Sequence, residues 1–483
     1  MTMTDQSYVE IIQAKEEDYS RWYLDIVKKA DLMDYGPVKG TMIMKPYGYA
    51  IWERMQRELD DRIKATGHQN AYFPLLIPKS YLEREMDHVE GFAPEVAWVT
   101  KGGNEELEEP LVIRPTSETI ICAMMSKWIQ SYRDLPLKLN QWANVMRWEK
   151  TTRPFLRTSE FLWQEGHTAH ATYEEAEEEA MTMLGVYQEF AEHVLAIPVV
   201  PGQKTENEKF AGADHTYSLE ALMSDGKALQ FATSHHLGQH FAEPFEIQYT
   251  DKDNQLHYVY QTSWGASTRM IGGLIMTHSD NRGLVLPPRI APIQVVIVPI
   301  FAKQKDEVLA AAQAIRAQLA ERGIRVHLDD REAFTPGWKF NEYELKGVPV
   351  RIELGPKDLA KNQVVIARRD TGEKEAFPIA ELAQHSEELL ETIQQHLYDR
   401  ASNFVKERTW EVKDLQELSE VIEKERGFYQ SWWCGDIACL DEIKDKTSAT
   451  ARNLPFAHQR EGEGTCICCG KKSTQTVFLA RAY

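Results

Sequence analysis

Residues 147–157 read RWEKTTRPFLR, and this stretch indicates the kind of site that the fold has to build. An arginine and a glutamate stand two residues apart, a loop with threonine and proline follows, and another arginine ends the stretch. Side chains two apart on a strand point to the same face, so Arg147 and Glu149 can serve one site, to which the loop can return Arg157. Guanidinium groups bind phosphate through a planar fork, so the stretch predicts an arginine-based phosphate site.

A second arginine motif lies far downstream. Residues 265–273 read GASTRMIGG, in which Arg269 opens an apolar run that contains glycine. The chain has no GxxxxGK[ST] sequence, so a glycine-rich phosphate loop is excluded. Two separated arginine motifs without such a loop favour a nucleotide site built from arginine side chains.

Length and composition are typical of a large enzyme with several domains. The chain has 483 residues, which predicts about three domains, and 43% of them are hydrophobic. It contains no run of 18 apolar residues, so no membrane span is expected. The net charge of −19 argues against a protein that coats DNA or RNA non-specifically, although a local basic groove is compatible with it. Residues 1–7 have neither a basic region nor an apolar core, so no signal peptide is expected.

The order of predicted elements divides the chain into three parts. Residues 1–285 are expected to form one mixed α/β unit, and the proline-rich stretch 287–292 is predicted to be a linker. The next part, to about residue 400, alternates strand, helix and strand, which predicts a small parallel α/β domain. Residues 401–483 begin with helical patterns and end in a cysteine cluster. The expected helices are 18–30, 47–66, 172–194 and 305–322, and the expected strands are 70–78, 294–300, 325–328 and 347–354.

Longer motifs show a resemblance to a known family. They include RPTSE at 114–118, FLRTSEFLWQEGHTAH at 155–170, KTENEKFAGADHTYSLEALM at 204–223, TSHHLGQ at 233–239 and TSWGASTR at 262–269. The two arginine motifs are similar to motifs 2 and 3 of class II aminoacyl-tRNA synthetases. The whole set resembles the prolyl-tRNA synthetase family, in its archaeal/eukaryotic-like form with a C-terminal zinc-binding extension.

The resemblance implies a fold and an assembly. It implies an α+β catalytic domain on an antiparallel sheet with flanking helices at 1–285, an α/β anticodon-binding domain at 286–400, and a small α+β zinc-binding domain at 401–483. It also implies a cytoplasmic homodimer, in which the first class II motif, around residues 73–78, lies near the subunit interface. The C-terminal Tyr483 is expected to pack back towards the catalytic domain.

The implied reaction joins L-proline to tRNA(Pro) through a prolyl-adenylate, with ATP, Mg²⁺ and a structural Zn²⁺. The carboxylate and the α-phosphate repel each other, so we expect Arg147 to bridge them, while Arg157 and Arg269 neutralise the outer phosphates. Arg147, Glu149 and Arg269 are the expected catalytic residues. Phe155 is expected to stack on adenine and Gln230 to contact the magnesium ion. The expected ATP-binding residues are Arg147, Glu149, Phe155, Arg157, Thr158, Gln230, Thr233, Ser267 and Arg269.

The proline and anticodon sites follow from the chemistry of their ligands. The ring ammonium of proline has two N–H donors, which the Glu118 carboxylate and the Thr116 hydroxyl are suited to accept. The apolar ring needs aromatic walls, and the anticodon guanines need carboxylate and arginine partners. The expected proline-binding residues are Thr116, Glu118, Arg147, Trp163, Glu165, His167, Phe210, His235 and Trp264, and the expected anticodon contacts are Glu344, Arg351 and Asp358.

Five of the six cysteines fall in the last 50 residues. Their spacing predicts a closed, structural four-thiolate zinc site. The knuckle formed by Cys466, Cys469 and Gly470 favours Cys434, Cys439, Cys466 and Cys469 as ligands, with Cys468 as the rival. Buried or disulfide-bonded cysteines are the alternative.

Two other functions are compatible with parts of the pattern. One is another class II synthetase, such as a threonyl or glycyl type, but the pocket motifs lack the cysteine and histidine set of a zinc-dependent threonyl site. The other is a non-catalytic RNA-binding paralogue. Such paralogues usually lose the motif arginines, and Arg147, Arg157 and Arg269 are all present.

Overall fold

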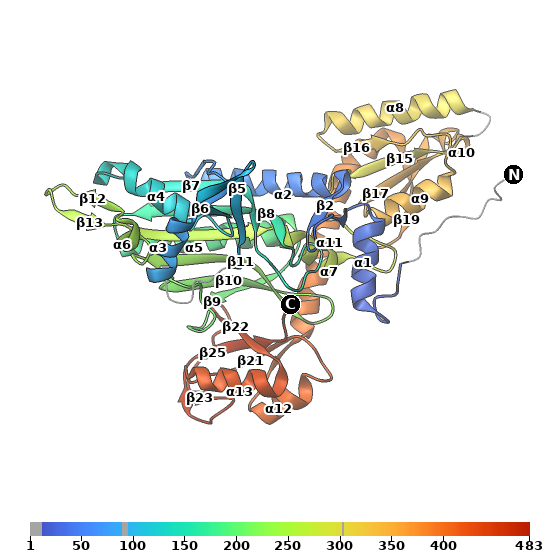
Figure 1. Ribbon diagram of the computed structural model, residues 1–483. Coiled ribbons are helices and arrows are strands. Elements are labelled where there is room, and N and C mark those ends of the chain that lie inside the picture. Colours follow the sequence, from blue (N-terminus) through green and yellow to red (C-terminus); the bar gives the residue numbers. More distant parts are fainter. Residues whose placement is uncertain (1–11, 89–94, 302–303) are drawn as a thin grey trace.

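The computed structural model describes residues 12–88, 95–301 and 304–483. The chain start, on which the expectation of no signal peptide rests, lies outside these residues. The catalytic part forms the centre of the molecule, the second α/β part lies at one end, and the C-terminal part lies beneath the central sheet in Figure 1. No helix of the described residues is long and apolar enough to cross a bilayer.

An antiparallel sheet forms the core of the catalytic part, as the family resemblance implies. Its central strands are β9 (Val199–Gln203), β10 (His215–Leu222), β11 (Ala228–Gly238), β14 (Tyr260–Ser267), β8 (Glu160–His170) and β7 (Leu137–Met146), in that spatial order. Each pairs antiparallel with its neighbour. The short β3 (Gln69–Asn70) adds a parallel edge beside β7.

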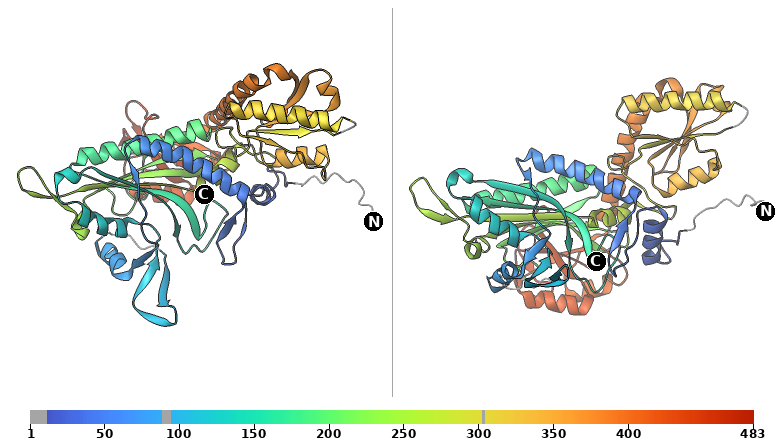
Figure 2. Two further views of the ribbon diagram at one scale, coloured as in Figure 1. Left: turned by 90° about the horizontal axis from the view of Figure 1, so that it is seen from above. Right: turned by 45° about the horizontal axis from the view of Figure 1, so that its top comes forward.

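Helices cover one face of this sheet (Figure 2). The helix α5 (Tyr173–Glu189) begins where the Thr172 hydroxyl accepts from the Glu175 backbone N–H, and glutamates fill its first turn. It continues into a π-turn over Phe190–Val194. The Ser234 hydroxyl of β11 donates to the Ala180 carbonyl of α5 at 2.7 Å. The helices α1 (Tyr19–Lys29) and α2 (Pro46–Ala65) agree with the predicted helices. The helix α7 (Arg269–His278) was not predicted.

The strand expected over residues 70–78 is wrong in its length. It is split into β3 and β4 (Leu76–Pro78), and β4 joins a separate small sheet with β6 (Glu105–Ile113) and β5 (Ala97–Gly102). Pro74 lies between the two pieces and has no N–H for a strand ladder, so the chain passes from one sheet to the other there. The first arginine motif also lies just beyond its strand, because β7 ends at Met146.

The second part has the predicted parallel strands and two more. β16 (Val326–Leu328), β15 (Val295–Pro299) and β17 (Val350–Leu354) are parallel. β18 (Gln363–Arg368) and β19 (Lys374–Pro378) extend the sheet antiparallel and were not predicted. The helix α8 (Lys305–Glu321) ends two residues before Gly323, whose φ of 76° terminates the helix as expected. The helices α9 (Pro336–Leu345) and α10 (Pro356–Leu359) also belong to this second part.

The C-terminal part is continuous with its neighbours. The boundary expected at residue 400 lies inside α11 (Leu382–Glu407), a helix that runs from the second part to the third (Figure 1). Strand β22 (Thr450–Pro455) pairs with β9, so the C-terminal strands extend the catalytic sheet to eleven strands in the described residues. The remaining elements are β20 (Thr409–Glu411), α12 (Leu415–Val421), β21 (Phe428–Trp432), α13 (Ile437–Thr447), β23 (Gly464–Thr465), β24 (Lys472–Ser473) and β25 (Thr476–Ala480).

Candidate active site

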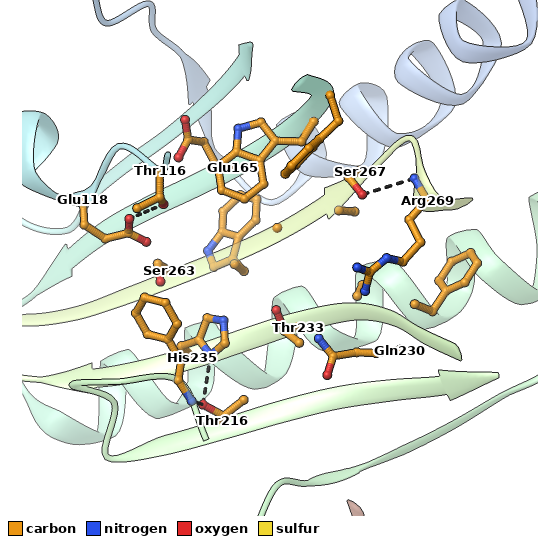
Figure 3. Close-up of a pocket in the computed structure, with 18 of the residues that line it drawn as sticks. Thr116, Glu118, Glu165, Thr216, Gln230, Thr233, His235, Ser263, Ser267 and Arg269 are labelled. Atoms are coloured by element: carbon orange, nitrogen blue, oxygen red, sulfur yellow. Dashed lines mark hydrogen bonds between the residues drawn. The ribbon is translucent and has the colours of Figure 1, made fainter. Parts of the chain in front are cut away.

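A cavity of about 300 Å³ opens on the face of the central sheet that α5 does not cover. Strands β8, β11 and β14 form its floor, and the start of α4 (Glu118–Trp128) closes one side (Figure 3). The predicted residues that it brings together are Thr116, Glu118, Arg147, Trp163, Glu165, His167, Phe210, Gln230, Thr233, His235, Trp264, Ser267 and Arg269.

A bulge in β11 explains how three of these side chains share one face. Thr233 and His235 face the cavity, whereas Ser234 faces α5, as strand alternation requires. Gln230 lies three residues before Thr233 and should point the other way. The pairing of β10 with β11 shifts by one residue between Leu219 and Glu220, and this bulge returns Gln230 to the cavity face. Figure 3 shows Gln230, Thr233 and His235 side by side.

Carboxylates gather at one end of the cavity. The Thr116 hydroxyl donates to Glu118, and Glu165 accepts from the Ser117 hydroxyl at 2.5 Å and from the Gln141 amide at 2.8 Å. Burial alone raises the pKa of Glu165, but the hydrogen bonds and the positive charge of His167 outweigh it and lower that pKa. This end therefore carries negative charge and suits a cationic ligand.

The contact between Glu165 and His167 favours the charged form of both side chains, because it lowers the pKa of Glu165 and raises the pKa of His167. Burial acts to lower the pKa of His167, but the bond to Glu165 at 3.1 Å and the charge of Glu118 raise it overall. Burial and the neighbouring His167 lower the pKa of His235 to about 3, so His235 is neutral near pH 7. The His235 ring lies 4.7 Å from that of Phe210, and its Nδ1 is 2.9 Å from the Thr216 hydroxyl.

Trp264 borders the cavity from the other side of the sheet. It is paired with Ser234 and Gly166, both of which belong to the α5 face, while its neighbours Ser263 and Gly265 face the cavity. Its indole makes an edge contact with His68 at 4.9 Å between ring centroids. A Cβ at Gly166 would lie 2.1 Å from the indole, so only glycine fits there. Trp264 therefore supports the floor and does not form an aromatic wall facing the cavity.

Cations occupy the rest of the cavity: Arg147 lies between the carboxylates and Arg269, and Arg269 marks the opposite end. Arg147 is held by a bond from its Nε to the Pro115 carbonyl at 3.0 Å, and Arg269 by a bond to the Leu156 carbonyl at 3.0 Å. Burial, then the charges of Arg157 and Arg147, lower the pKa of Arg269 to about 10, so it still carries its charge near pH 7. Arg157 lies 3.9 Å from Glu149 and does not line this cavity. Two half-buried arginines so close together favour an anionic ligand.

The structure corrects two of the predicted ATP contacts. The Phe155 ring is 2% exposed and belongs to the hydrophobic core, so no base can stack on it. Phe161 lines the cavity instead, with the Arg147 guanidinium 5.5 Å from its ring. Its alternation with Trp163 and Glu165 along β8 was the signal that the sequence offered. Thr158 is buried and donates to the Glu160 carbonyl at 2.7 Å, away from the cavity.

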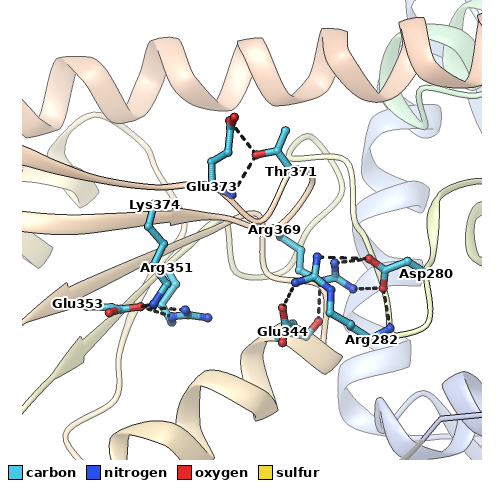
Figure 4. Close-up of polar contacts among 9 residues, drawn as sticks. All are labelled: Asp280, Arg282, Glu344, Arg351, Glu353, Arg369, Thr371, Glu373 and Lys374. Carbon is cyan, nitrogen blue, oxygen red and sulfur yellow. Dashed lines mark hydrogen bonds and ion pairs between the residues drawn. The ribbon is translucent and has the colours of Figure 1, made fainter.

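A second cavity, of about 260 Å³, lies on the α/β part and contains two of the three expected anticodon contacts. Glu344 and Arg351 line it together with Arg282, which comes from the end of the catalytic part and was not predicted. Figure 4 shows Arg282 reaching Glu344, at 2.7 Å, and Arg351 bound to Glu353. Asp358 does not line this cavity, because its carboxylate accepts from the Gly355 N–H at the start of α10.

Four cysteine thiols converge in the C-terminal part. The Sγ atoms of Cys434, Cys439, Cys466 and Cys469 all lie within 4.8 Å of one another. Cys434 is 3.8 Å from Cys439 and 3.6 Å from Cys469. A tetrahedral zinc site with Zn–S bonds of about 2.3 Å has sulfur atoms about 3.8 Å apart, so the cluster fits that ion. The rival Cys468 turns away and contacts Glu442 at 3.0 Å.

Comparisons with known proteins give consistent matches over the chain. The class II core domain of tRNA synthetases (G, H, P, S and T) matches residues 98–278, an anticodon binding domain matches 294–389, and the C-terminal domain of prolyl-tRNA synthetase matches 415–483. Proline–tRNA ligases of Natranaerobius thermophilus and Alkaliphilus oremlandii are each 57% identical and cover 100% of both chains. The crystal structure of prolyl-tRNA synthetase from Cryptosporidium parvum, complexed with halofuginone and AMPPNP, has a TM-score of 0.94 and 43% identity over 99% of this chain and 100% of its own.

Proposed function

Since the chain belongs to the prolyl-tRNA synthetase family, we propose how its residues divide the work of ligating proline to tRNA. The chain is an ATP-dependent proline–tRNA ligase of class II. It activates L-proline as an adenylate, releases pyrophosphate, and transfers the prolyl group to tRNA. The observation that carries the assignment of the site is the division of one cavity into a carboxylate end and an arginine end. The ring ammonium of proline belongs at the first and the triphosphate at the second.

The arginine end holds the two reacting anions in line. Arg147 lies between the ends, 5.4 Å from the Trp163 ring, where it can bind both the proline carboxylate and the α-phosphate. Arg269 neutralises the outer phosphates, and we assign a share of this role to Arg157, which lines a neighbouring small cavity together with Arg269. We assign adenine stacking to Phe161 in place of Phe155. Glu149 keeps Arg157 oriented through their contact.

Class II synthetases use Mg²⁺ with ATP, and the phosphate end offers suitable donors for this hard cation. The Gln230 side-chain amide and the Thr233 hydroxyl lie at the cavity beside Arg269. Magnesium is held mainly by phosphate oxygens and few protein groups, so this small oxygen set fits. The ion, when bound, offsets charge on the phosphates. The protein side chains themselves hold the nucleotide against the sheet.

The carboxylate end selects the amino acid. Glu118 accepts from the ring ammonium, and the Thr116 oxygen is positioned beside it by their hydrogen bond. Trp163, His167 and Phe210 enclose the apolar ring of proline. Neutral His235 lies near the position of the proline carboxylate. We place Trp264 behind the floor. Amino-acid-dependent ATP–pyrophosphate exchange with all twenty amino acids tests the assignment, and strong exchange is expected with proline. Strong exchange with threonine or glycine contradicts the assignment, and so does the absence of exchange with proline.

The second cavity is the proposed site for the anticodon of tRNA(Pro). Guanine presents N–H donors to a carboxylate and the O6 and N7 acceptors to an arginine, and Glu344 and Arg351 supply one of each in one cavity. Arg282 adds a cation suited to a phosphate. Asp358, which caps α10, is left out of the proposed site.

We propose that the thiol cluster holds one structural Zn²⁺ per chain. Elemental analysis of the purified protein is expected to find about one equivalent of zinc, because four thiolates bind it tightly. Chelation should increase hydrogen exchange in residues 408–483 more than it lowers proline activation, since the cluster lies around α13 and the β23–β24 hairpin and none of its cysteines lines the cavity. Folded protein that contains no zinc and has oxidised cysteines contradicts the proposal, and Cys122→Ser is the control that should keep the full zinc content.

A homodimer is the proposed assembly. Large apolar side chains stand exposed around β4: Tyr72 is 75% exposed, Leu76 39%, Trp98 48% and Trp128 49%. Such a group is unusual on a monomer and typical of a contact between proteins. A sedimentation mass of one chain at micromolar concentration contradicts a stable dimer. A role in protein synthesis supports the cytoplasm as its compartment.

A further inference from the structure

A buried cluster of charges joins the C-terminal part to the catalytic sheet. Glu220 on β10 is completely buried, Lys204 is 4% exposed and Arg452 is 8% exposed. The Lys204 Nζ lies 2.9 Å from the Glu220 carboxylate. Arg452, on β22, donates to the same carboxylate from Nε at 3.0 Å and reaches it with Nη2 at 2.9 Å. Two cations therefore face one anion, and the cluster has one net positive charge.

The cluster is next to the phosphate end of the active site. Glu220 is the cross-strand partner of Gln230, which lines the cavity. Thr216 and Ser218 precede it on the same face of β10, where Thr216 contacts His235 and Ser218 donates to Glu220 at 3.2 Å. Glu220 therefore continues the row of cavity-facing side chains towards the C-terminal part.

The C-terminal part also reaches the other strand of this hairpin. The Tyr483 N–H donates to the Ala228 carbonyl, two residues before Gln230, and the Tyr483 ring is 5.2 Å from the Arg153 guanidinium. Tyr483 and Arg269 line one small cavity together. The expected packing of Tyr483 against the catalytic part is confirmed, and the C-terminal part contacts both strands that carry the phosphate end.

We propose that Arg452 is a positioning residue for ATP: by neutralising Glu220 it keeps the potential at Gln230 and Arg269 favourable for the triphosphate. The proposal rests on the assignment of that end of the cavity to the phosphates. Without Arg452, a buried carboxylate one strand away from the phosphates is balanced only by Lys204. In a site of low polarity, one unit of charge at this range changes the binding of an anion measurably.

The charge states support this role. Burial raises the pKa of Glu220, but Lys204 and Arg452 outweigh burial and hold that pKa below its ordinary value, so the carboxylate is ionised. Burial and the charges of Arg157 and Arg147 lower the pKa of Arg269, and Glu220 is one of the two anions that act against them. Glu220 and Arg269 thus interact across the floor of the site.

The test uses two substitutions with opposite expected signs. Arg452→Gln removes the cation and is expected to raise KM for ATP in pyrophosphate exchange about tenfold, with little change in KM for proline. Glu220→Gln removes the anion and is expected to lower KM for ATP severalfold. The double variant should return close to the wild-type value, and Arg452→Lys should keep most of the ATP affinity.

A purely structural role predicts different results. If Arg452 only docks the C-terminal part, KM for ATP and proline change together or not at all, and the double variant is no better than Arg452→Gln. Either result overturns the proposal, and so does a raised KM for ATP in Glu220→Gln, which remains informative if Arg452→Gln does not fold. Arg289→Gln breaks an exposed ion pair with Glu391 at 2.9 Å and serves as the matched control. If Arg269→Ala also leaves ATP binding intact, the phosphate end itself is misplaced.

Discussion

Replacing Arg269 or Arg147 with alanine is expected to reduce proline-dependent ATP–pyrophosphate exchange about 10²- to 10³-fold, while the fold remains intact. Each guanidinium is fixed by a hydrogen bond to a backbone carbonyl, so it meets the phosphates already oriented. Loss of one such preorganised contact costs on the order of 3–4 kcal/mol in the transition state. The measurement is kcat/KM for exchange, with circular dichroism to verify folding.

The effects of the two substitutions should differ in kind. Arg147→Ala should raise KM for both proline and ATP, because its side chain lies between the two ends of the cavity, whereas Arg269→Ala should affect ATP alone. Arg322→Ala, which removes an exposed arginine paired with Glu387 at 2.9 Å, is the matched control. Near-normal exchange in either active-site variant would show that the active site lies elsewhere.

Arg351→Ala is expected to leave proline activation unchanged and to lower tRNA charging about 5- to 150-fold. A contact between an arginine and a guanine edge is worth roughly 1–3 kcal/mol, which gives that range. The substitution should be tolerated by the fold, because the Glu353 carboxylate that Arg351 contacts also pairs with Lys374 at 2.7 Å. The comparison is aminoacylation against pyrophosphate exchange in the same preparation.

Glu118→Gln provides the reciprocal variant. It replaces a charged acceptor for the ring ammonium with a neutral amide, so proline activation should fall roughly 10- to 150-fold, as expected for a charged hydrogen bond of about 1.5–3 kcal/mol. Charging should fall only as far as activation does. If Arg351→Ala lowers exchange and charging equally, or neither, its assignment to the anticodon is wrong.

The sequence by itself determined the fold class, the reaction and most of the chemistry-bearing residues. Motifs such as RWE and TSWGASTR combine residue types that few sites require, and their order along the chain is specific to one family. Helix boundaries also followed from local signals, because capping depends on near neighbours: Thr172 begins α5 and Gly323 follows α8. The cysteine spacing likewise gave the four thiols that converge, since a knuckle is a local turn.

Only the tertiary structure decided which face each side chain occupies. Strand alternation predicts the face on which a side chain lies only as far as the first bulge. Gln230 faces the cavity because of a register shift that no local signal in β11 reveals. Alternation along β14 puts the Trp264 side chain on the face of the sheet opposite the cavity. The path of the loop buries Phe155 in the core, whereas Phe161 lines the cavity. The pairing of β22 with β9 brings Arg452 to Glu220 across 232 residues of sequence. Such long-range contacts depend on how the sheets assemble, which is a property of the whole packed chain and not of any one segment.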